Sequence, residues 1–243
     1  MRSGNPFLGD NTFEIVDRGE AKMTLMGTVN KTAILLALTL ISALWVWNEY
    51  FELQDPAAIL PLMWIGIIGG LVMAVITILA KKAAPYTAPG YALLEGLALG
   101  GISAFYESRY PGIVIQAVGL TFGTLACLLA AYRSGLIKAT ENFKLGIIAA
   151  TGAIALLYIV NMVMSMFGHS FGFIHEGGTV GILFSLVVVT VAALNLVLDF
   201  DFIENGVANG SPKYMEWYGA FGLLVTLVWL YLEMLRLLSK LRK

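Results

Sequence analysis

Long apolar runs, separated by short polar spacers, make up most of the chain. A transmembrane helix needs about 20 mostly apolar residues, and seven runs approach or exceed this length. The third run is short, and the last two contain charged residues. The runs cover residues 32–50, 57–80, 90–106, 113–132, 145–167, 178–202 and 217–238. The pattern predicts an all-α, polytopic membrane bundle of about seven transmembrane helices, with a polar tail at residues 1–30 and one membrane domain at residues 31–243.

Composition supports a membrane protein and excludes several other classes. The chain is 58% hydrophobic and 13% charged, with a mean hydropathy of +0.81, whereas soluble domains carry about 25% charged residues. A net charge of −1 gives no basic footprint for nucleic acid. A lone cysteine, Cys127, allows no intrachain disulfide, and two histidines are too few for a histidine-built metal site. We therefore expect the lipid bilayer as partner, with no nucleic acid and no bound metal.

Lysine and arginine in the short loops predict the orientation. The tail and the even-numbered loops are basic, whereas the loop after the first run is acidic. The N-terminus is therefore expected in the cytosol. A seventh crossing would place Arg236, Lys240, Arg242 and Lys243 on the opposite side. The last run either turns back within the membrane or crosses against the rule.

Three pairs of glycines have the spacing that lets transmembrane helices approach closely. They are Gly66 with Gly70, Gly96 with Gly100, and Gly119 with Gly123. We expect these pairs to pack the bundle. The alternative is that they mark helices that slide or part during gating.

Ionisable residues inside the apolar runs are the candidate functional residues, because a charge at membrane depth costs about 3 kcal/mol or more. Glu95 lies in the third run, Asp199 and Asp201 near the end of the sixth, and Glu233 with Arg236 in the seventh. Asp199 and Asp201 point to different sides of a helix. Glu233 and Arg236 share a face and can pair. For each acid the alternative is structural: a buried hydrogen bond, a helix end in water, or an ion pair.

Motifs of catalysis and cofactor binding are missing from the sequence. It contains no glycine-rich phosphate loop, nucleophile elbow, His-Glu-x-x-His or haem motif. His169 and His175 lie in a glycine-rich outer loop, which favours an ordinary loop over a metal site. The sequence therefore predicts no enzyme and no cofactor.

Four segments from three of the apolar runs carry a family resemblance. They are Asn195-Leu-Val-Leu-Asp199-Phe-Asp201-Phe-Ile-Glu204, the two stretches Glu216-Trp-Tyr-Gly-Ala-Phe-Gly222 and Leu230-Tyr-Leu-Glu233-Met-Leu-Arg236, and Gly90-Tyr-Ala-Leu-Leu-Glu95-Gly96. In their order along the chain, within seven runs of matching size, these segments resemble the bacterial members of the transmembrane Bax inhibitor motif family. The resemblance implies six helices around a central seventh, in the bacterial cytoplasmic (inner) membrane. It also implies a pH-sensitive leak channel for calcium.

The resemblance also implies a gate of two aspartates that share a proton, with an arginine as latch. Asp199 matches the first aspartate, Thr226 stands where the second is expected, and Glu233 lies one heptad further along the same face. Lys81 or Lys82 lies nearest to the latch position. The predicted sensor and gate is therefore the set Asp199, Asp201, Glu233 and Thr226, with Glu95 and Asp199 along the path of a permeant cation such as Ca²⁺.

Physical chemistry gives this gate a mechanism. Two carboxylates in contact cannot both ionise cheaply, so they share a proton. Calcium favours carboxylate oxygens. Protonation is expected to close the path, and Asp199→Asn to change the flux.

A second hypothesis is that the protein is a non-conducting regulatory partner of a membrane protease or other quality-control machinery, which it contacts through residues 1–30. A proton-coupled transporter would show repeat symmetry, which the sequence lacks. The oligomeric state stays open.

Overall fold

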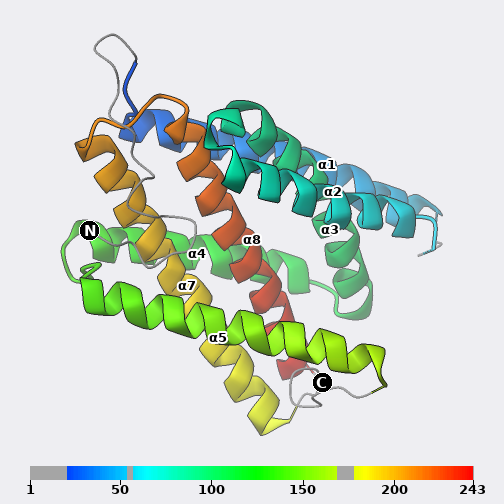
Figure 1. Ribbon diagram of the computed structural model, residues 1–243. Helices are drawn as coiled ribbons and strands as arrows, with labels where there is room; N and C mark the ends of the chain where they lie inside the picture. Colours follow the sequence, from blue (N-terminus) through cyan, green and yellow to red (C-terminus); the bar gives the residue numbers. More distant parts are fainter. Residues whose placement is uncertain (1–20, 54–56, 169–177, 243) are drawn as a thin grey trace. The chain divides into compact units, whose positions relative to one another are not determined.

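The computed structural model describes residues 21–53, 57–168 and 178–242 (Figure 1). Within these ranges the chain forms seven α-helices, one 3-10 turn (η2) and no strands. The elements are α1 (Leu25–Leu53), α2 (Leu60–Leu79), η2 (Lys81–Ala83), α3 (Ala84–Arg109), α4 (Ile113–Arg133), α5 (Glu141–Met166), α7 (Thr179–Ala208) and α8 (Met215–Leu241). The predicted all-helical, polytopic bundle is confirmed.

Six of these helices are long and apolar enough to cross a membrane, and α3 is the exception in the described chain. Its 26 residues provide the length. Its buried face, however, consists mostly of alanine and glycine, which lower its hydropathy. The third crossing stays a prediction.

Two helices, α1 and α3, begin well over a turn earlier than the apolar pattern predicts. α1 starts at Leu25, inside the predicted tail, and residues 1–20 lie outside the described chain. α3 starts at Ala84 and includes Pro89. Pro85 lies in the first turn, where a missing N–H costs nothing. The helix tolerates the single hydrogen bond that Pro89 removes.

The chain forms two compact units, and α7 and α8 each contribute to both. Among the described residues, the first unit contains residues 112–168, 178–201 and 226–242, and the second contains residues 21–53, 57–111 and 202–225.

Close glycine contacts hold α1, α2 and α3 together in the second unit (Figure 1). A Cβ at Gly66 would lie 2.6 Å from the carbonyl oxygen of Leu94, and a Cβ at Gly100 would overlap the backbone of Ala43. The prediction for the pairs in α2 and α3 is confirmed. It is wrong for Gly119 and Gly123 of α4, which have no described atom within 4 Å of a Cβ position.

In the first unit, α5 crosses α7 and contacts α8 (Figure 1). The apolar core between these helices consists of Ile154, Val188 and Val191, with Phe184 and Trp229 packed around them. A polar contact lies in the same contact zone, because Asn195 of α7 donates to the hydroxyl of Thr151 at 2.8 Å.

The last helix, α8, is continuous over 27 residues, about 40 Å, which excludes a turn back within it. It also has the largest buried share of the six apolar helices, 56% of its most apolar stretch. Its basic residues are not loop charges. Arg236 pairs with Glu233, and Lys240 is buried with its ammonium on the Gly181 carbonyl and the Ser185 hydroxyl. Because both cations have partners within the first unit, they are poor indicators of the side of the membrane on which this end of the chain lies.

Candidate functional site

Asp199 occupies a buried position on α7 in the first unit, and no cation of the described residues forms an ion pair with it. Its carboxyl group is hydrogen-bonded to the side chain of Thr226 on α8. The second oxygen, Oδ2, is buried and has no hydrogen-bond partner among the described residues. An ionised carboxylate here would have one hydroxyl and no cation to stabilise it, although burying an unpaired charge costs several kcal/mol.

Glu233 takes part in a different cluster of the same unit, between α5 and α8. It is 2% exposed, and Arg236 donates to both carboxylate oxygens, at 2.6 and 2.8 Å. The hydroxyl of Tyr158 donates to Oε1 at 3.0 Å and accepts from Arg236, whose guanidinium lies 5.1 Å from the centre of the Tyr158 ring. No hydrogen bond or ion pair joins Glu233 to Asp199 in the described structure. Thus Thr226 is the residue of α8 that is hydrogen-bonded to Asp199, whereas Glu233 interacts with Arg236 and Tyr158.

Asp201 is likewise neutralised by a cation of its own unit. The ammonium of Lys144, at the start of α5, lies 2.7 Å from its Oδ2, and 3.4 Å from Glu141. Asp199 and Asp201 therefore differ, as their helical positions predict: Asp199 is buried without a cation among the described residues, and Asp201 is partly exposed and ion-paired.

Glu95 lies on α3 in the second unit and resembles Asp199 in its surroundings. Its carboxyl group is hydrogen-bonded to the hydroxyl of Tyr91, one turn earlier. The Tyr91 ring is itself held edge-on against Phe221, with 5.0 Å between ring centres. Gly70 of α2 leaves room for the carboxylate, because a Cβ there would lie 3.2 Å from Oε2. No ion pair forms with Glu95 in the part of the chain described.

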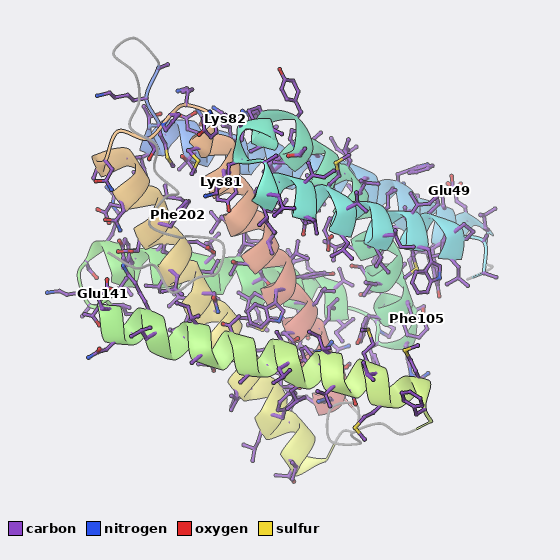
Figure 2. All side chains as sticks on the ribbon, in the orientation of Figure 1. Glu49, Lys81, Lys82, Phe105, Glu141 and Phe202 are labelled. Atoms are coloured by element: carbon purple, nitrogen blue, oxygen red, sulfur yellow. The ribbon has the colours of Figure 1, made fainter. Side chains whose placement is uncertain are left out.

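The two latch candidates both lie in the second unit, at the start of the segment that leads into α3. The ammonium of Lys81 lies over the ring of Tyr218 on α8, 5.8 Å from its centre. Lys82 follows in η2 and is exposed (Figure 2). His169 and His175 lie outside the described residues, as does Glu176. Within those residues, no three His, Cys, Asp or Glu side chains are grouped to hold a metal ion.

The whole-chain comparison decides the family. Residues 5–243, nearly the entire sequence, match the family described as Bax inhibitor 1 like. The chain belongs to this family. Comparisons with curated proteins and with solved structures give no match. Membership and the apolar helices together make the protein an integral membrane protein of the Bax inhibitor 1 like family.

Several residues that shape the site were not predicted from the sequence. Tyr158 interrupts an apolar run, and a buried tyrosine hydroxyl usually finds a polar partner, so its position was a usable signal. Lys144 looked like a loop charge because its partner, Asp201, is 57 positions away. Distance along the sequence hid this pair.

Proposed function

We propose that the protein is a pH-sensitive leak channel for cations, with Ca²⁺ as a permeant ion and the Asp199 carboxyl as its sensor. One observation supports this proposal above the others. Of the predicted sensor acids, Asp201 and Glu233 each have a cation at ion-pair distance, whereas Asp199 has only Thr226 and an unpartnered oxygen. A group in such surroundings changes its interactions most when it gains or loses a proton.

The gate works with one acid and one hydroxyl in place of two acids. Protonated Asp199 is neutral and needs only the hydrogen bond to Thr226, which keeps α7 and α8 together in the first unit. When the pH rises, the carboxylate gains a charge that one hydroxyl cannot stabilise, so water or a cation is drawn in. Flux therefore increases as the pH rises and falls as Asp199 is protonated.

The permeant ion follows from the ligand chemistry of the uncompensated acids. Calcium binds carboxylate, carbonyl and water oxygens, and acidic side chains along a path attract cations and repel anions. Among the described residues, Glu95 and Asp199 are the candidate acids without an ion pair, and we propose that each attracts the permeant cation within its own unit. Lys81 and Lys82 remain the latch candidates, and the protein is not expected to act as an enzyme.

The test is calcium flux into dye-loaded proteoliposomes between mildly acidic and mildly alkaline pH. Wild type should show flux that rises with pH, and Asp199→Asn should lose the pH dependence. Asp201→Asn is the matched control, since it makes the same chemical change two residues away on an ion-paired acid, and it should keep the profile. If Asp199→Asn titrates like wild type, the sensor is assigned to the wrong residue.

Absence of flux at every pH, in protein that is folded and inserted, would overturn the channel. It would favour the regulatory partner of a membrane protease instead.

The location in the cell is proposed from the sequence. The N-terminus is expected in the cytosol, and the membrane is expected to be the bacterial inner membrane.

A further inference from the structure

The short extended segment before α1 is attached to the turn that leads into α8, within the second unit (Figure 1). Lys22 and Pro212 form an antiparallel bridge, and two backbone hydrogen bonds flank it, at 2.7 and 2.9 Å. They run from the N–H of Met23 to the carbonyl of Ser211, and from the N–H of Lys213 to the carbonyl of Ala21. We call residues 21–24 the strap, because this segment ties the start of α1 to the start of α8.

Glu216, in the first turn of α8, holds the side-chain end of the strap. Its carboxylate is buried and accepts from both the N–H and the hydroxyl of Thr24, each at 2.9 Å. Lys31 of α1 and Lys213 of the turn donate to the same carboxylate. Gly27 allows this approach, because a Cβ there would overlap the carboxylate. Hydrogen bonds to an ionised group are about twice as strong as neutral ones, so Glu216 joins the strap, α1 and α8 firmly.

The side chain of Met23 adds an apolar contact to the strap. Met23 is 2% exposed, and its methyl group lies 3.6 Å from the position that a Cβ of Gly219 on α8 would occupy. Ile203 of α7 and Thr28 of α1 lie against the same position. Burial of an apolar side chain is favourable in proportion to the area removed from water, so hydrophobic packing and hydrogen bonds both hold the strap in place.

The part of α8 that the strap holds also supports Glu95, the acid proposed above to attract the cation in this unit. The ring of Phe221 packs edge-on against Tyr91 of α3, with 5.0 Å between ring centres. The hydroxyl of Tyr91 is hydrogen-bonded to Glu95. Phe221 follows Glu216 by about 7.5 Å along one continuous helix. A displacement of the first turns of α8 therefore removes the ring that supports Tyr91, and with it the hydrogen bond to Glu95.

We propose that the strap is a regulatory clamp on the start of α8. When the strap is bound to the turn, α8 supports Tyr91 and Glu95 stays in its hydrogen bond. When the strap is released, the Glu95 carboxylate is free to bind the permeant cation, because calcium favours carboxylate oxygens. This inference rests on the proposed cation path and adds a second control to it, separate from the protonation of Asp199 in the first unit.

The first test compares one protein with its strap locked and free. Lys22→Cys and Pro212→Cys place two thiols at the bridge, and Cys127→Ser removes the native cysteine, which is exposed. A bridge pair that exchanges no hydrogen bond of its own has Cα atoms about 4.5 Å apart, which a disulfide can span. Calcium flux into dye-loaded proteoliposomes is measured before oxidation, after oxidation and after reduction. The locked protein should lose most of its flux, and reduction should restore it.

The second test releases the strap without changing a charge. Gly27→Ala forces the Glu216 carboxylate away from Thr24, and one hydrogen bond to a charged group corresponds to about tenfold in an equilibrium. Flux should therefore rise about tenfold. Gly119→Ala is the matched control on α4, where no described atom lies within 4 Å of the Cβ position. Hydrogen exchange at the Met23 amide measures release directly, and it should be faster in Gly27→Ala and slower in the locked protein.

The outcomes separate the failure of the strap from the failure of the channel. Wild-type protein without flux would overturn the channel and its control by the strap together. Wild-type flux that stays equal in the locked and the reduced protein would overturn the strap alone. Faster exchange at Met23 in Gly27→Ala with unchanged flux would also overturn it, since the strap would then be structural. If Gly27→Ala fails to fold, the reversible disulfide decides.

Discussion

Removing the charge of Glu233 should destabilise the protein through the arginine that is left behind. Glu233→Gln keeps the shape of the side chain and an acceptor for Tyr158, but it removes the counter-ion of Arg236. Breaking a buried ion pair costs about 3–5 kcal/mol. Because Arg236 is 31% exposed, water recovers part of this cost, and we expect a loss of about 2–3 kcal/mol.

The double variant Glu233→Gln/Arg236→Gln separates charge from packing. Replacing both members of a buried pair by neutral groups is often close to neutral, so the double variant should recover most of the stability lost by the single one. Thermal unfolding in detergent measures this. At about 3 °C per kcal/mol, the single variant should melt about 6–9 °C below wild type. Glu52→Gln, which changes an exposed acid of α1, should not shift the transition.

The same variants examine whether Glu233 is part of the sensor. If the ion pair is structural, the double variant should keep the pH profile of calcium flux in liposomes. A melting temperature of the single variant equal to that of wild type, or a double variant less stable than the single one, would refute the charge argument. A shifted flux profile in the stable double variant would instead return Glu233 to the gate.

Three further predictions concern packing and burial, each measured by unfolding or proteolysis in detergent. Gly100→Ala should cost about 1–3 kcal/mol, because its Cβ would overlap the backbone of α1. Gly123→Ala should be neutral or stabilise by up to about 1 kcal/mol, because no described atom lies within 4 Å of its Cβ position. Glu216→Gln should cost about 3 kcal/mol by leaving two lysines without their carboxylate, and should speed tryptic cleavage at Lys213. Asp199→Asn should melt at or above wild type, because it removes an acid that no cation compensates.

The fold was largely predictable because the bilayer restricts it. A chain in lipid must satisfy its backbone hydrogen bonds within each helix, so the apolar pattern gave all seven helices, although α1 and α3 begin earlier than it predicts. Helix packing was less predictable. Gly96 with Gly100 and Gly119 with Gly123 have the same spacing, yet only the first pair meets a neighbouring helix in the described structure. The spacing indicates which glycines allow a neighbouring helix to approach closely, and the tertiary structure decides which of them a helix actually contacts.

The candidate site was predictable in its residues and not in its pairings. Asp199, Asp201 and Glu233 were identified because an ionisable residue is costly in an apolar run. Their partners depend on which helices lie side by side, and only the i,i+3 pair of Glu233 and Arg236 could be inferred from one helix. Lys144 for Asp201 and Tyr158 for Glu233 come from another helix. The sequence pattern within a single apolar run carries no information about partners that lie on another helix.

These pairings divide the acids at membrane depth into two chemical kinds. Asp201 and Glu233 are each paired with a cation, so protonating either one would break an ion pair. The pair of Asp201 with Lys144 joins α7 to α5, whereas the pair of Glu233 with Arg236 lies within α8. Asp199 and Glu95 are each hydrogen-bonded to a single neutral hydroxyl. Their protonated forms are therefore stable in a dry interior, whereas their ionised forms require water or a metal ion. A pH-dependent path needs groups of the second kind, because only they favour a dry interior in one protonation state and a hydrated one in the other.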